Sequence, residues 1–146
     1  MNKSLSLKIL NEEYSIHQCP SKYSVPDTVS DSEFLSVSHT PDETTIICRS
    51  NIKFDSQKKD GDWRCIQLVG EFDLEIKGVW ARITSIVAEA GSPVLAITTF
   101  DTDYFLVKAE FLEPVQKSCT IRIQQNAGCI KGEHITYRIT DRCSYC

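Results

Sequence analysis

One stretch of the sequence, from Gly78 to Lys108, constrains the fold more than any other because it combines two hydrophobic periods. Its first part repeats apolar residues at helical spacing, which predicts an amphipathic helix that begins near Val79. Gly91 is the residue type that ends a helix in the left-handed conformation, and Pro93 cannot continue a helix. The chain is therefore expected to leave the helix at this point.

Two strands joined by an acidic turn are expected after this helix. Val94–Phe100 and Tyr104–Val107 are rich in β-branched, aromatic and other apolar residues, which is typical of strands. Asp101 to Asp103 connects them, and Asp is a common turn residue. Residues 110–116 then predict a short helix, which Pro114 is expected to end early.

A strand is also expected before the helix, which gives most of the order βαββαβ. Trp63–Val69 predicts a strand, and Phe72, Leu74 and Ile76 continue with a strict period of two after Gly70. A further strand is needed for the order βαββαβ, and either residues 120–124 or the first half of the chain can supply it. The predicted fold class is α+β, ferredoxin-like, an antiparallel sheet with helices on one face.

The first half of the chain predicts short strands and loops. The strands are expected at residues 5–10, 14–19, 34–39 and 44–48. Thr40-Pro-Asp-Glu43 predicts the turn of a hairpin because proline has the backbone angle that the second turn position needs. Residues 20–33 are rich in Pro, Ser and Asp, and residues 53–62 are charged, so both predict loops.

Bulk composition excludes several functions. At 146 residues the chain can form one compact domain, or two very small ones that share a core. A net charge of -4, without a basic patch, argues against nucleic acid as a partner. No apolar run approaches the ~20 residues of a membrane helix, and the N-terminus does not resemble a signal peptide. We therefore expect no membrane partner and a cytoplasmic location.

The cysteines allow two interpretations. Seven cysteines is an odd number, so disulfides cannot pair all of them within one chain. Cys48 and Cys65 lie in apolar runs, which predicts buried reduced thiols. Cys143-Ser-Tyr-Cys146 is a CxxC sequence at the C-terminal end, and a thiol or zinc function of the tail is the alternative that it offers. We expect no metal site, because the other tail cysteines lack the spacing of paired zinc ligands.

No enzyme chemistry is predicted. The three histidines, at positions 17, 39 and 134, are scattered, so their spacing indicates no Ser-His or Cys-His pair. Neither the P-loop pattern nor the GxGxxG pattern occurs. We therefore expect a protein that is not an enzyme and needs no cofactor.

The order of these segments resembles a known family. Trp63-Arg64 opens a strand, Gly78-Val79 starts the helix, Ala-Glu-Ala-Gly closes it at Gly91, and ITTFDTDY follows. The segment FLSVSHTPDETTIICRS resembles a first-module hairpin. Together, over roughly residues 10–116, they resemble ACT-domain proteins related to the cytosolic arginine sensors, the CASTOR type.

This resemblance implies an organisation and leaves one part unmatched. It implies two ACT-type modules packed together, at residues 1–62 and 63–117. Thr98 stands where the family usually has Ser, and Ser92-Pro93 stands where it usually has a β-branched pair; both changes are compatible with the fold. The Cys-rich tail, residues 118–146, does not match the family, and its structure is left open.

The resemblance also implies where a ligand binds. Unpaired amides at a helix start suit a carboxylate, and Asp carboxylates suit an amino group, so a zwitterion is the expected ligand. The ligand-binding residues that it implies are Gly78, Val79, Thr98, Thr99, Phe100, Asp101, Thr102 and Asp103. The alternative is purely structural: Gly78 relieves a tight junction and the two Asp residues only build the turn.

The sequence leaves three possible functions. The favoured one is a non-enzymatic, amino-acid-binding regulatory protein that transmits binding through module packing, a homo-oligomer or a protein partner. The second is a module that only dimerises or binds a partner and takes no ligand. The third is a thiol or zinc protein that uses the C-terminal cysteines.

Overall fold

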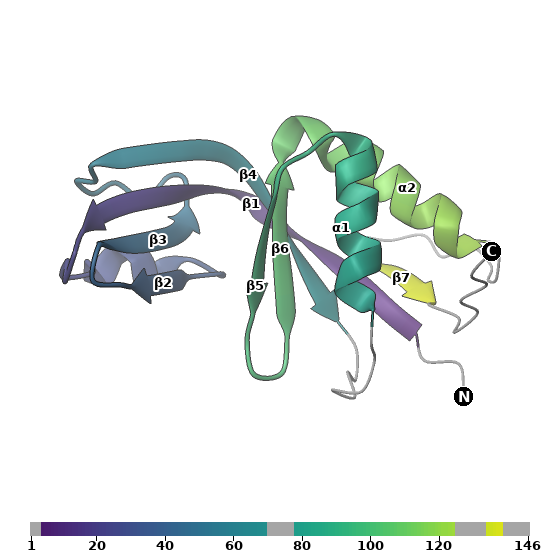
Figure 1. The fold of residues 1–146 in the computed structure, drawn as a ribbon, viewed down its shortest axis with the longest axis horizontal. Coiled ribbons are helices and arrows are strands. Elements are labelled where there is room, and N and C mark those ends of the chain that lie inside the picture. The colour runs from purple at the N-terminus through teal and green to yellow at the C-terminus, as the bar shows by residue number, and fades with distance from the viewer. Residues whose placement is uncertain (1–3, 70–77, 125–133, 139–146) are drawn as a thin grey trace. The chain divides into compact units, whose positions relative to one another are not determined.

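The computed structural model describes the backbone of residues 4–69, 78–124 and 134–138, and the side chains of residues 7–69 and 78–119. Figure 1 shows its elements. They are β1 (Ser4–Pro20), η1 (Asp27–Asp31), β2 (Ser36–His39), β3 (Glu43–Arg49), β4 (Lys58–Val69), α1 (Val79–Ala90), β5 (Val94–Thr98), β6 (Asp103–Lys108), η2 (Ala109–Phe111), α2 (Leu112–Gln124) and β7 (His134–Arg138). The predicted α+β class, with antiparallel strands, is confirmed.

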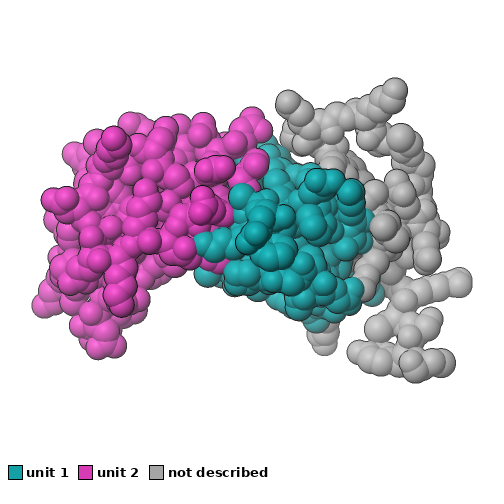
Figure 2. Space-filling model, turned by 90° about the horizontal axis from the view of Figure 1, so that it is seen from above, with its two compact units in different colours: residues 1–10, 65–146 teal, residues 11–64 magenta. Residues whose placement is uncertain are grey.

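The chain forms two compact units, coloured separately in Figure 2. Unit 1 contains residues 1–10 and 65–146, and unit 2 contains residues 11–64. Both β1 and β4 contribute residues to each unit. Unit 1 therefore combines the N-terminal part of the chain with its second half.

Unit 1 is a sheet covered by two helices. The strands follow the order β7-β1-β4-β6-β5, and α1 and α2 pack against a single apolar cluster. This cluster joins Leu7 of β1, Ile66 of β4 and Phe105 of β6 to Val87 of α1 and Val115 of α2. The predicted arrangement of helices on one face of an antiparallel sheet is thus present in unit 1.

Helix α1 has the predicted bounds. It runs from Val79 to Ala90 between two glycines in the left-handed conformation, Gly78 at φ 86° and Gly91 at φ 87°. Its buried residues are Val79, Ile83, Ile86 and Val87. Left-handed backbone is strained for residues with a side chain, which explains why glycine occupies both ends.

Helix α2 corrects two predictions. Residues 120–124 were one of the two possible sources of the further strand, but they form the last part of α2, and the helix does not end at Gln116. Leu112, Val115 and Cys119 reach the core of unit 1, and their spacing is that of a helix face, so tertiary packing overrides the alternation in TIRIQ. Pro114 is tolerated because it lies in the first turn, where its missing N–H has no helical partner. The other predicted source is correct: β1 supplies the further strand.

Unit 2 is built from β2-β3-β1-β4 and has no α-helix in residues 11–64, all of which the structure describes. The predicted hairpin is present, with the turn at Thr40 to Glu43 closed by a backbone hydrogen bond of 2.9 Å. A cluster of Cys19, Val29, Ile46 and Cys48 forms its core. Tyr23, Val25, Ile52 and Phe54 pack on this cluster from connecting segments.

Two smaller expectations need correction. Residues 5–10 and 14–19 belong to one continuous strand, β1. Residues 58–62, predicted as loop, begin β4, because a charged segment with exposed side chains can still pair its backbone. Residue 57 donates its amide to the Gln18 carbonyl at 2.8 Å just before β4 begins. The predicted strand at 72–76 lies outside the described residues, whereas part of the unmatched tail forms β7 beside β1.

Candidate functional site

The start of α1 presents backbone amides without a side-chain cap. Gly78 is exposed and occupies the cap position, and its carbonyl accepts the first helical hydrogen bond, from Arg82 at 3.2 Å. No acidic side chain lies in the first turn. The first amides of a helix carry partial positive charge, so an anion is favoured here. Val79 has a buried side chain, 8% exposed, so it can offer a ligand only its backbone.

The β5–β6 hairpin places the other predicted site residues around a tight turn. Thr98 pairs with Asp103 at the base of the turn. The Thr99 amide donates to the Thr102 carbonyl at 3.0 Å, and the Thr102 amide donates to the Thr99 hydroxyl at 3.2 Å. The Thr99 hydroxyl also donates to the Thr102 carbonyl. The two threonines therefore build the turn.

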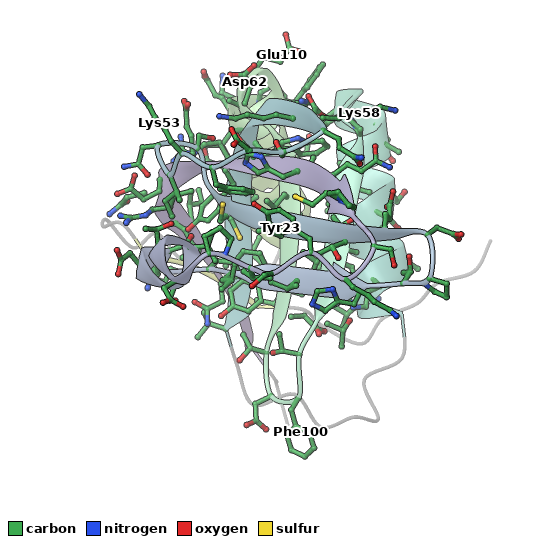
Figure 3. All side chains as sticks on the ribbon, turned by 90° about the vertical axis from the view of Figure 1, so that its left-hand side faces the viewer. Tyr23, Lys53, Lys58, Asp62, Phe100 and Glu110 are labelled. Carbon is green, nitrogen blue, oxygen red and sulfur yellow. The ribbon has the colours of Figure 1, made fainter. Side chains whose placement is uncertain are left out.

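Phe100 and Asp101 are exposed at the tip of this turn. The Phe100 side chain is 98% exposed and points away from the protein (Figure 3). Neither residue makes a hydrogen bond or ion pair among the residues that the structure describes, so the fold itself does not use these side chains. They remain available to a ligand or a partner.

One hydrogen bond joins the helix start to the hairpin. Trp80 donates its indole N–H to the Asp103 carboxylate at 3.2 Å, and its ring meets Phe105 edge to face at 6.4 Å. The start of α1 and the hairpin tip lie at the same end of unit 1 (Figure 1). The two predicted halves of the site are thus near one another, and Trp80, which sequence reasoning did not select, connects them.

A second group of polar side chains lies in unit 2 and was not foreseen. His17 is 2% exposed, its Nδ1 is 2.9 Å from the Ser56 hydroxyl, and its ring lies 4.4 Å from the Phe54 ring. Burial, and secondly the positive charge of Lys59, lower the pKa of His17. His17 and Ser56 are 39 residues apart, so no spacing in the sequence could indicate this pair.

The described cysteines are buried thiols. Cys19, Cys48, Cys65 and Cys119 are free and buried, which confirms the prediction for Cys48 and Cys65. Burial raises the pKa of the Cys19 and Cys48 thiols, so neither is an activated nucleophile. Within residues 7–69 and 78–119, no three His, Cys, Asp or Glu side chains are grouped to hold a metal ion. The CxxC sequence lies outside the described residues.

Comparison with known proteins identifies the family that part of the chain resembles. Residues 58–118 match the ACT domain family. The matched segment contains β4, α1, the β5–β6 hairpin and the beginning of α2, and thus every predicted site residue. It is a single match, so a second ACT module in the N-terminal part stays a prediction. A search of curated proteins finds no match.

Solved structures support the same fold. A protein from Agobacterium tumefaciens is 29% identical, with a TM-score of 0.70 over 77% of this chain and 84% of that chain. A Vibrio cholerae protein of unknown function, described as a possible transport protein, is 16% identical, with a TM-score of 0.56 over 78% and 89%. The ligand-free regulatory subunit of aspartate kinase from Thermus thermophilus is 11% identical, with a TM-score of 0.55 over 81% and 96%. At these identities the last two show the fold alone.

None of the described helices is long and apolar enough to cross a membrane.

Proposed function

We propose that this chain is a regulatory protein that binds an amino acid at the end of unit 1 and does not catalyse a reaction. The observation that carries the proposal is the ACT domain match over residues 58–118, which includes both halves of the predicted site. A neighbour of the same fold is itself named as a regulatory subunit, which favours the same kind of role. The site would contain Gly78, Val79 and residues 98–103.

The geometry suits a zwitterion. The carboxylate of the ligand would meet the first amides of α1, where the helix dipole favours negative charge. Its ammonium would meet Asp101, which is exposed, or Asp103, of which Trp80 engages only one oxygen. The exposed Phe100 ring at the hairpin tip is available for contact with the ligand. No covalent step is required, so the proposed protein acts through binding alone.

Binding would be transmitted by packing. A ligand that touches both α1 and the hairpin favours one arrangement of these elements over others, and a partner or second copy that contacts them would sense the change. The proposal includes a cytoplasmic location and transmission of the binding signal through a homo-oligomer or a protein partner. Arginine is the first ligand to test because the sequence resembles the CASTOR-type sensors.

The direct test is thermal unfolding of the full chain with each of the twenty amino acids at millimolar concentration. A ligand present at 100 times its dissociation constant stabilises the folded state by about 2.7 kcal/mol. For a chain of this size we expect Tm to rise by several degrees with one or two amino acids. A panel that leaves Tm unchanged contradicts the proposal.

Two variants then locate the site. Asp101→Asn removes a carboxylate from the exposed tip and should reduce the ligand-induced rise in Tm, whereas Asp42→Asn, in the exposed turn of unit 2, should not. Gly78→Asn keeps a residue that tolerates left-handed backbone and adds a side chain over the amides, so it should also weaken binding. Wild-type affinity in both site variants would exclude this location.

A further inference from the structure

Unit 2 contains a shallow cavity of about 390 Å³ on its sheet. The residues that line it lie between Ile16 and Asp60, so it shares none with the site proposed in unit 1. Strands β1, β3 and β4 all contribute to its lining. The partly buried Ile16 gives it an apolar wall, and polar or charged side chains supply the rest. Its volume lies within the range of about 300 to 1,000 Å³ that small-molecule pockets occupy.

The Glu43 carboxylate is held in a fixed orientation inside this cavity. The Thr45 hydroxyl donates to Oε1 at 3.1 Å, and the Gln18 side-chain amide donates to Oε2. The backbone is fixed as well, because the Glu43 amide donates to the Thr40 hydroxyl at 3.1 Å. Both side-chain donors are neutral, and a carboxylate accepts about four hydrogen bonds, so capacity for a positive group remains.

Lys58 supplies the opposite charge. It is the first residue of β4, directly after the amide of residue 57 that bonds to the Gln18 carbonyl. Its exposed ammonium makes no hydrogen bond or ion pair with any residue that the structure describes. Lys53 does not line the cavity and lies on the opposite side of the view in Figure 3 from Lys58, so it provides a control.

Two further charged side chains line the cavity, and each makes one hydrogen bond to a neutral group. Lys59 donates its ammonium to the Ser50 carbonyl at 3.3 Å. Asp60 accepts the Trp63 indole N–H at 3.2 Å. Both keep their charge, so the lining has charges of both signs; Glu43 is the carboxylate oriented by two side-chain donors, and Lys58 is the cation whose ammonium has no bond to a described residue.

We propose that this cavity binds a small zwitterion, with the anionic group of the ligand at Lys58 and its ammonium at Glu43. Charge-assisted hydrogen bonds at both ends favour such a ligand over one with a single charge. A simple anion is repelled by Glu43, and a simple cation is repelled by Lys58. The proposal adds a second site in unit 2 and does not rest on the function proposed for unit 1.

The test uses the full ¹⁵N-labelled chain and probes that differ in the separation of their charges. Glycine, β-alanine and γ-aminobutyrate are titrated separately, with acetate and methylammonium as probes of a single charge. We expect at least one zwitterion to shift the amide resonances of Gln18, Thr45 and Lys58, and the two single-charge probes to leave them unmoved at the same concentration. Equal shifts with acetate or methylammonium would overturn the proposal, as would a spectrum in which no probe moves these resonances.

Charge-removing variants complete the test. Lys58→Met and Glu43→Gln should each weaken binding of the zwitterion by about tenfold or more, since each removes one charge-assisted contact. Lys53→Met and Asp31→Asn, which change exposed charges elsewhere in unit 2, should leave the affinity unchanged. The spectrum of each variant also reports whether it folds. An equal loss of affinity in cavity and control variants would show only a general effect of charge and would exclude the site.

Discussion

The two units have cores of different chemistry. In unit 1 two helices cover the sheet, and the core cluster is almost entirely aliphatic or aromatic, with Phe105 and Val107 fully buried. In unit 2 loops cover the core, and buried polar groups lie among the apolar ones, including His17, Ser15 and Thr44. Unit 1 is therefore stabilised mainly by packing, whereas unit 2 also depends on hydrogen bonds to its buried polar groups.

The largest expected effect tests the packing of unit 1. Phe105→Ala should lower the free energy of unfolding by about 3 to 5 kcal/mol because it leaves a cavity beside α1. Phe100→Ala, five residues earlier in the same hairpin, removes a ring that is 98% exposed, and its effect should stay within about 0.5 kcal/mol. Urea denaturation of both variants measures the difference. Similar losses in the two would contradict the assignment of Phe105 to the core.

The next effect tests the polar core of unit 2 through pH. The pKa of His17 is lowered in the folded chain, whereas in the unfolded chain a histidine has a pKa of about 6.5. As the pH falls below 6.5, the unfolded chain therefore takes up a proton at this ring before the folded chain does. Stability is therefore full above pH 6.5 and falls as the pH decreases toward the folded-state pKa. One proton accounts for a slope of at most about 1.4 kcal/mol per pH unit.

His17→Gln should flatten this decrease between pH 7 and 5. His39 is exposed, with its Nδ1 2.8 Å from the Thr44 hydroxyl, and His39→Gln is the matched control for replacing a histidine of unit 2. Urea midpoints measured at several pH values give both slopes. The same slope in wild type and His17→Gln would show that this histidine does not set the acid sensitivity.

The smallest effect concerns the contact that joins the two halves of the proposed site. Asp103→Ala removes the acceptor of the Trp80 indole N–H and should cost about 0.5 to 1.5 kcal/mol of stability. Asp103→Asn keeps an acceptor and should cost less. A double-mutant cycle with Trp80→Phe measures the coupling. No coupling would mean that the helix start and the hairpin are fixed independently.

The sequence predicts unit 1 better than it predicts unit 2, because α1 and the β5–β6 hairpin in unit 1 have clear local hydrophobic patterns. Helix α1 is readable because its apolar stripe is continuous and glycines occupy both ends. The β5–β6 hairpin is readable because a polar turn divides two apolar runs. Local patterns of this kind also indicate the turn at Thr40 to Glu43.

Other features depend on partners that are distant in the sequence. The TIRIQ segment alternates like a strand, yet Val115 and Cys119 before it set a helical face. The first part of β4 is charged, and only pairing with β1 shows it to be a strand. The His17–Ser56 contact and the oriented Glu43 carboxylate likewise bring together residues far apart in the chain. Such contacts have no local signature.

We propose that an amino acid binds between the start of α1 and the turn of the β5–β6 hairpin. The most direct measurement compares amide spectra of the ¹⁵N-labelled chain with and without a mixture of the twenty amino acids at millimolar concentration. We expect shifts at Val79, Trp80 and residues 98–103, whatever occurs at the cavity of unit 2. Unmoved resonances at all of these positions would contradict it.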